Sequence, residues 1–107
     1  MTFTIEQLET AAEEINSGTA YGDVWSDVKY GDADQLRDKL GAKSLTQVDG
    51  YGGEGEGDDL WVVFDVDGQL FRKSGYWVSH DGCYWDGALE EVEPYEVTVT
   101  RYREVKR

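Results

Sequence analysis

Hydrophobic residues at the start of the chain recur with the period of an α-helix. In IEQLETAAEEIN, residues 5–16, apolar positions follow one another at spacings of three and four, at Ile5, Leu8, Ala12 and Ile15. Thr4 and Gln7 have the spacing of a capping box, and Gly18 suits the end of a helix. The pattern therefore predicts a helix over residues 5–16.

A second, shorter helix is predicted over residues 33–40, ADQLRDKL, with its two leucines facing inward. We expect Asp32 to cap its start and Gly41 to end it. The segment between the two helices, residues 18–31, is rich in aromatic residues and glycine. Its pattern does not decide between a short helical turn and an irregular packed segment.

The hydrophobic period changes to two at residue 60, which is typical of a β-strand. In LWVVFDV, residues 60–66, one face carries Leu60, Val62, Phe64 and Val66, and the other carries Trp61, Val63 and Asp65. The next two residues, Asp67 and Gly68, are a preferred pair for a two-residue type I′ hairpin turn. This turn pairs the strand with residues 69–73 and sets Phe64 opposite Phe71.

Further strands are predicted on both sides of this hairpin. Residues 44–48 indicate an edge strand, and turns are expected at His80-Asp81-Gly82 and Asp86-Gly87. After Pro94, the alternation in YEVTVTRYREV, residues 95–105, predicts a long strand with its tyrosine and valines on the inner face.

Two helices thus precede three to five antiparallel strands. This order predicts an α+β fold in which the helices pack on one face of a C-terminal β-meander. A chain of 107 residues normally builds one hydrophobic core, so we expect a single domain over residues 1–107.

The chain is strongly acidic, with 23 acidic residues against 10 basic ones and a formal net charge of −13. Most of the excess lies in residues 1–59, which carry 14 acids and 4 bases. Contacts to nucleic-acid phosphates or anionic lipids need clustered Lys and Arg, so we expect no direct nucleic-acid binding and no membrane binding. A protein with a basic surface is the natural complement.

Features that indicate location point to a reducing cytoplasm. No apolar run approaches the roughly 18 residues that a membrane span needs, and the N-terminus lacks the pattern of a secretion signal. The single cysteine, Cys83, cannot form an internal disulfide.

The stretch DGYGGEGEGDD, residues 49–59, combines five glycines with five acids. It lacks the lysine of a phosphate-binding loop, and its carboxylates would repel phosphate. Two interpretations stay open: a mobile, solvated connection, or a flexible acidic arm that settles on a basic groove of a partner.

The segment from residue 52 to residue 94 resembles a family of small acidic proteins encoded by bacteriophages, especially phages of actinobacteria. The resemblance consists of a GGEGxGD start, a strand with a central Phe, an FR pair, a GYxxSxxG segment, a DG turn and an EVxP end. The matching residues are Gly52, Gly53, Gly55, Gly57, Asp58, Phe64, Phe71, Arg72, Gly75, Tyr76, Ser79, Gly82, Asp86, Gly87, Glu91, Val92 and Pro94. The resemblance implies a phage origin and a location in the host cytoplasm. It assigns no catalytic residue to this chain.

Candidate catalytic and metal chemistry is weak. Cys83 lies near His80 and Asp81, but the chain has no second histidine, and a structural cysteine is the preferred interpretation. Zinc needs three or four Cys or His ligands, and only two are present. Residues 65–68 imitate the start of an EF-hand loop, yet position twelve would be Tyr76, so the hairpin is favoured. We expect no enzyme activity, no cofactor and no metal.

The sequence thus predicts a phage accessory protein that binds and inhibits a host nucleic-acid-binding protein, such as a defence nuclease or CRISPR complex. Its acidic face would imitate nucleic-acid phosphates in a basic groove. The expected acidic contacts are Glu9, Glu13, Asp23, Asp27, Glu54, Glu56, Asp58 and Asp59, and the expected aromatic anchors are Trp61, Trp77 and Trp85.

Three alternatives are weighed against it. The first is a structural or assembly module that docks through an aromatic sheet face, with the acids serving solubility. The second is an enzyme that acts on a small ligand. The third is adaptation to a saline cytoplasm, which the ten Lys and Arg residues, half of them Lys, disfavour.

Overall fold

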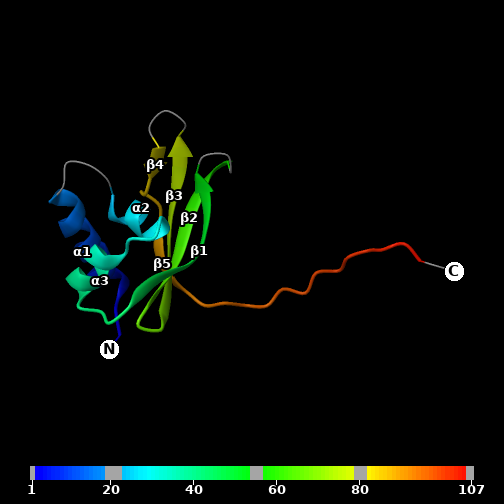
Figure 1. Cartoon of the computed structure of the whole chain (residues 1–107), viewed down its shortest axis with the longest axis horizontal. Coiled ribbons are helices and arrows are strands. Elements are labelled where there is room, and N and C mark those ends of the chain that lie inside the picture. The colour runs from blue at the N-terminus through cyan, green and yellow to red at the C-terminus, as the bar shows by residue number, and fades with distance from the viewer. Residues whose placement is uncertain (1, 19–22, 54–56, 79–81, 106–107) are drawn as a thin grey trace.

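Figure 1 shows the computed structural model of the chain, which describes residues 2–18, 23–53, 57–78 and 82–105. Three helices come first: α1 (Ile5–Ser17), α2 (Val24–Lys29) and α3 (Asp34–Leu40). The strands follow: β1 (Leu45–Gly53), β2 (Gly57–Val66), β3 (Gln69–Val78), β4 (Gly82–Tyr84) and β5 (Leu89–Val92). The helices lie together on one face of the sheet, which confirms the α+β prediction (Figure 1).

Helix α1 begins and ends where the sequence predicts. The Thr4 side chain accepts a hydrogen bond from the backbone N–H of Gln7, and the Gln7 side chain accepts one from the backbone N–H of Thr4, which completes the capping box. Gly18 follows the last turn. Leu8 is fully buried, whereas Ile5 at the start of the predicted stripe is 38% exposed.

Helix α2 lies in the segment between the two predicted helices, whose pattern did not decide between a short helix and an irregular segment. Asp23 caps it, because its side chain accepts a hydrogen bond from the backbone N–H of Trp25 at 2.9 Å. The side-chain oxygen of Asn16 on α1 accepts from the backbone N–H of Val24 at 2.8 Å. The side chain of Asn16 thus fixes the start of α2 against the end of α1.

Helix α3 differs slightly from the prediction at its start. The N-cap position is Ala33, which has no side-chain bond to offer, so the expectation that Asp32 is the cap was wrong by one residue. The Asp32 carboxylate instead accepts from the backbone N–H of Asp34 at 3.3 Å. Gly41 ends the helix with a φ of 72°, a left-handed conformation that glycine adopts without strain.

The sheet is antiparallel and built around the predicted hairpin. The strand order is β1-β2-β3-β4, and β5 also pairs with β3. Asp67 and Gly68 both have positive φ, 49° and 95°, as a type I′ turn requires. Phe64 pairs with Phe71 as predicted, and their rings lie 5.9 Å apart.

The inner face of the sheet forms the core together with the helices. The predicted inward row of β2 is buried, with exposures of 0 to 1% for Leu60, Val62, Phe64 and Val66. Trp25 of α2 packs on Phe64 with a ring separation of 5.6 Å. The indole N–H of Trp85 donates to the hydroxyl of Ser26 at 2.7 Å, so this tryptophan joins the core from the segment after β4.

Most of the glycine–acid stretch belongs to strands rather than to a loop. Residues 49–53 continue β1 and residues 57–59 begin β2, so both interpretations that treat residues 49–59 as a flexible segment were wrong for these parts. Residues 54–56 lie outside the described residues. The pairing of β1 with β2 shifts register at Val48 and at Gly52, and Gly52 is buried with a φ of 95°. Here glycine permits a bulge and a close backbone approach.

The predicted strand over residues 95–105 was wrong. This segment has no regular secondary structure and extends away from the sheet (Figure 1). Its alternating residues are exposed, at 84% for Tyr95, 67% for Val97 and 64% for Val99. A period of two shows which residues share a side, but a strand also needs a neighbour for its backbone groups, and the described part of the chain places none beside this segment.

Replacing Gly52 with alanine should strongly destabilise the fold. A Cβ at this position would overlap the backbone carbonyl of Asp59, and the positive φ adds strain. We expect the free energy of unfolding to fall by about 2 to 5 kcal/mol, measured by urea denaturation. Gly68→Ala is the matched control, because Gly68 has the same φ of 95° with open space around its Cβ; it should cost about 1 to 2 kcal/mol. Equal losses for both variants would contradict the steric argument.

Candidate protein-binding surface

Two of the predicted acidic contacts border a groove between α1, α2 and β3. Glu9 and Glu13 are exposed and lie one helical turn apart on α1. The groove has a volume of about 250 Å³ and is lined by Glu9, Ala12, Glu13, Asn16, Trp25 and Lys73. Asn16, which also lines this groove, accepts a hydrogen bond from the backbone N–H of Val24. The groove therefore lies next to the N-terminus of α2.

Helix α2 brings three carboxylates close together. Asp23 is its N-cap, Asp27 lies in its first turn, and Asp32 follows its end. Burial of Asp27 raises the pKa of its carboxyl group above the ordinary value of 3.8, and the negative charges of Asp32 and Asp23 raise it further. We call Glu9, Glu13, Asp23, Asp27 and Asp32 the helix acidic cluster.

Four other acids form ion pairs with neighbouring bases. On α3, Arg37 pairs with Asp34 at 3.0 Å and with Asp38 at 3.1 Å. Lys39 reaches Glu14 on α1 at 2.8 Å, and Arg72 on β3 pairs with Glu90 on β5 at 3.1 Å. Within the described residues, none of these ion pairs includes a member of the helix acidic cluster. Acids are therefore interleaved with bases around α3 and at Glu90 of β5, whereas the helix acidic cluster, like exposed acids such as Asp49 and Glu91, forms no ion pair within the described residues.

The remaining predicted acids belong to the hairpin of β1 and β2. Asp59 is exposed on β2, where it pairs with Tyr76 of β3. Asp58 begins the same strand, but its side chain lies outside the described residues, as do Glu54 and Glu56. The structure therefore places one acidic side chain of this group and leaves three undescribed.

The predicted aromatic anchors separate onto different sides of the sheet. Trp61 is half-buried on the outer face, the face away from the helices, where its ring stacks on Tyr51 at 6.2 Å. Trp77 is half-buried and pairs with Cys83. Trp85 is only 7% exposed and donates a hydrogen bond to Ser26 inside the fold. The expectation that Trp85 is an exposed anchor was therefore wrong, because α2 covers it.

The outer face contains aromatic residues that the sequence analysis did not select. Tyr76 of β3 stacks on Tyr84 of β4 with ring centroids 5.0 Å apart. A groove of about 330 Å³ also opens near Trp61, lined by Val48, Asp49, Trp61, Val63, Leu70, Arg72, Val92, Glu93, Pro94 and Tyr95. The alternation of β3 places Leu70 and Tyr76 on the side opposite Phe71, so the period of two carried the signal for this face.

Lys73 is a buried charge that the sequence analysis missed. Within the described residues, Lys73 does not form a cross-strand ion pair of the kind that joins Arg72 to Glu90. Instead its side chain faces the helices, is 8% exposed, and donates a hydrogen bond to the carbonyl of Gly87 at 2.7 Å. Its ammonium group lies 5.7 Å from the centre of the Trp25 ring. Its position two residues after Phe71 predicts this inward direction.

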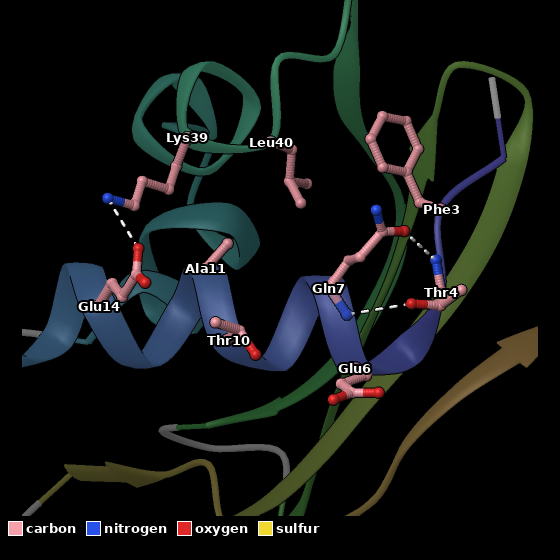
Figure 2. Close-up of a pocket in the computed structure, with 9 residues that line it drawn as sticks. All are labelled: Phe3, Thr4, Glu6, Gln7, Thr10, Ala11, Glu14, Lys39 and Leu40. Carbon is pink, nitrogen blue, oxygen red and sulfur yellow. Dashed lines mark hydrogen bonds and ion pairs between the residues drawn. The ribbon is translucent and has the colours of Figure 1, made fainter.

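The pocket between α1 and α3 has a volume of about 370 Å³ and is shown in Figure 2. Its polar groups are already used within the fold: Thr4 and Gln7 form the capping box, and Lys39 pairs with Glu14 across the pocket. Phe3 and Leu40 supply apolar walls. The described lining offers no nucleophile paired with a base, which catalysis of acyl or phosphoryl transfer would need.

Metal and thiol chemistry finds limited support in the described part of the chain. Among these residues, no group of three or more His, Cys, Asp or Glu side chains is arranged to hold a metal ion. Cys83 is a free, half-buried thiol packed against the core, and its sequence neighbours His80 and Asp81 lie outside the described residues. The Asp67 carboxylate accepts hydrogen bonds from the backbone N–H groups of Lys43 and Ser44, which tie the turn between β2 and β3 to the segment before β1.

Comparison of the sequence with protein families, with curated proteins and with solved structures found no match. In the described part of the chain, no helix is long and apolar enough to cross a membrane.

Asp27→Asn should stabilise the protein at neutral pH. The raised pKa means that the folded state holds the proton of Asp27 more tightly than the unfolded state does, so the ionised form costs stability. This cost is absent below pH 3.8 and develops as the pH rises through the pKa of the folded protein. The variant should therefore raise the midpoint of urea unfolding at pH 7, and the gain should vanish below pH 3.8.

Asp34→Asn is the matched control for this prediction, because Asp34 is also in the first turn of a helix but pairs with Arg37. It should leave the midpoint at pH 7 unchanged or lower it. A gain from Asp27→Asn that stays constant down to acidic pH would contradict the assignment to burial and repulsion of the ionised carboxylate.

Proposed function

We propose that this protein is a non-enzymatic phage accessory protein that binds and inhibits a host nucleic-acid-binding protein in the host cytoplasm. The contact surface consists of the helix acidic cluster together with the acids of the β1–β2 hairpin. These carboxylates take the place of nucleic-acid phosphates in a basic groove of the partner, which is a defence nuclease or a CRISPR-type complex. The phage origin rests on the resemblance in residues 52–94.

One observation carries the proposal: the helix acidic cluster forms no ion pair within the described residues, and three of its carboxylates lie close together at α2. Burial of Asp27, together with repulsion from Asp32 and Asp23, raises the pKa of its carboxyl group. A groove lined by Lys and Arg would relieve this repulsion on binding, so the same feature that costs stability in the free protein favours the complex.

The geometry of α1 supports phosphate mimicry in particular. Glu9 and Glu13 are four residues apart, which separates them by about 6 Å along the helix axis. Successive phosphates on one strand of duplex DNA advance by about 3.4 Å along its axis, so Glu9 and Glu13 span roughly two phosphate steps. The rigid helix presents them without the ordering cost of a flexible arm.

The proposal is tested by capture of host proteins and by competition with DNA. The full-length protein, immobilised, is exposed to lysate of a bacterial host at low and at high salt, and bound proteins are identified. Each purified candidate is then tested for displacement of duplex DNA by the phage protein. We expect a basic nucleic-acid-binding protein that is retained at low salt, released at high salt, and displaced from DNA.

Two matched charge variants sharpen this test. The first replaces Glu9, Glu13, Asp27 and Asp59 with Gln, Gln, Asn and Asn, and should weaken the affinity for the partner roughly tenfold or more. The control replaces the paired acids Glu14, Asp34, Asp38 and Glu90 in the same way, with the same change in net charge. Equal effects of the two variants, or an affinity that does not change with salt, would reject the mechanism.

The second candidate is a structural or assembly module that docks through the outer face of the sheet. It is favoured by the stacked pairs Tyr51–Trp61 and Tyr76–Tyr84 on a face that the described helices do not cover. Under this alternative, Trp61→Ser with Tyr76→Ser should abolish capture of the partner, whereas the first charge variant should leave it intact. Intact capture by the aromatic variant would exclude the alternative.

A further inference from the structure

The C-terminal segment, residues 95–105, has the pattern of a strand but extends away from its own sheet (Figure 1). Its exposures reach 93% at Tyr102 and 72% at Val105. Tyr95, Val97 and Val99 alternate with Glu96, Thr98 and Thr100, a composition rich in residues that favour strands. Such a segment is suited to pair with the edge of another sheet.

The sheet offers an open edge at β1. In the described structure, β1 pairs with β2 on one side and has no strand on the other. It also exposes apolar surface there, 57% for Val48 and 42% for Tyr51. The bulges at Val48 and Gly52 leave residues 45–47 and 49–51 of β1 free of irregularity. They disfavour edge-to-edge pairing of one β1 strand with another in an unlimited series.

The C-terminal residues 95–107, called the tail below, and the rest of the chain have net charges of opposite sign. Residues 95–107 carry four bases and two acids, a net charge of +2, while residues 1–94 carry six bases and 21 acids, a net charge of −15. The stretch that ends β1 and begins β2, residues 49–59, has five acids and no base. The tail is therefore attracted to the body of this protein, and above all to the β1–β2 hairpin.

The path of the tail favours a second copy over its own edge. Pro94 and Tyr95 line the outer-face groove together with Val48 and Asp49, so the tail starts on the outer face of the sheet, near β1. From there it runs across the direction of the strands and leaves the domain (Figure 1). To pair with its own β1 it would have to turn sharply after Tyr95, whereas the β1 edge of a second copy can receive it in its extended course.

We propose that residues 95–103 of one copy add as a strand to the β1 edge of a second copy, in a reciprocal exchange that forms a dimer. Both segments are nine residues long, about 30 Å at ~3.3 Å per residue, and regular pairing is expected over residues 45–47 and 49–51 of β1, on either side of the bulge at Val48. Backbone hydrogen bonds supply affinity, the valines extend the apolar outer face, and Arg101 and Arg103 approach the acidic hairpin. This dimer does not depend on the proposed host partner.

The test measures self-association of the purified, full-length protein by sedimentation velocity from low to high micromolar concentration. We expect a concentration-dependent dimer. Val97→Pro with Val99→Pro removes two backbone donors from the tail and should raise the dimer dissociation constant roughly tenfold or more. Val97→Ile with Val99→Ile is the matched control; it keeps the donors and the β-branched shape, and should leave the dimer in place.

Two further readouts separate the tail's role from a general effect on folding. Far-UV circular dichroism of the proline variant should match the parent protein, because the tail contributes none of the buried core residues. In the parent protein, dilution should shift the NMR amide signals of Thr46 and Asp49 on β1 together with those of the tail. A protein that is monomeric at every concentration, or a dimer that the prolines do not weaken, would overturn the proposal.

Discussion

Burial of the inward row of β2 is the interaction on which the rest of the structure depends. Leu60, Val62, Phe64 and Val66 are covered on one side by the helices and flanked within the sheet by Phe71. Each side chain of this kind contributes about 1.5 to 3 kcal/mol when it leaves water. No other element buries so continuous an apolar surface within the described residues. The helices hold their positions because this row gives their apolar sides a common surface to cover.

A strongly acidic chain can fold around this core because its charges are excluded from it. The one buried charge in the described core is basic: Lys73, which bonds to the Gly87 carbonyl and lies over the Trp25 ring. The acids are placed at helix starts, in ion pairs or on exposed strand positions. At α2, burial and the nearby charges of Asp32 and Asp23 raise the pKa of Asp27. A basic partner would relieve the repulsion among these three carboxylates.

The outer face of the sheet and the tail differ from the core in that the described structure gives them no covering layer and no strand partner. The outer face presents stacked aromatic rings without a covering layer of described helices, and β1 leaves its backbone groups open at the edge. Backbone donors and acceptors at an open edge attract a further strand, and the C-terminal segment has the pattern and the charge to be one. The helix acidic cluster and the open edge of β1 lie on different elements, whereas the acids of the β1–β2 hairpin belong to both proposed contacts.

The sequence by itself determined the features that depend on neighbours along the chain. The α1 capping box at Thr4, the Asp67-Gly68 turn, the Phe64–Phe71 register and the inward row of β2 all follow from local spacing. Only the tertiary structure decided that residues 49–53 are strand, that Trp85 is buried under α2, and that residues 95–105 lack a partner in their own sheet. The physical reason is that strand pairing and burial require contact between distant segments, whereas a period or a turn signal describes only which side of its own element a residue occupies.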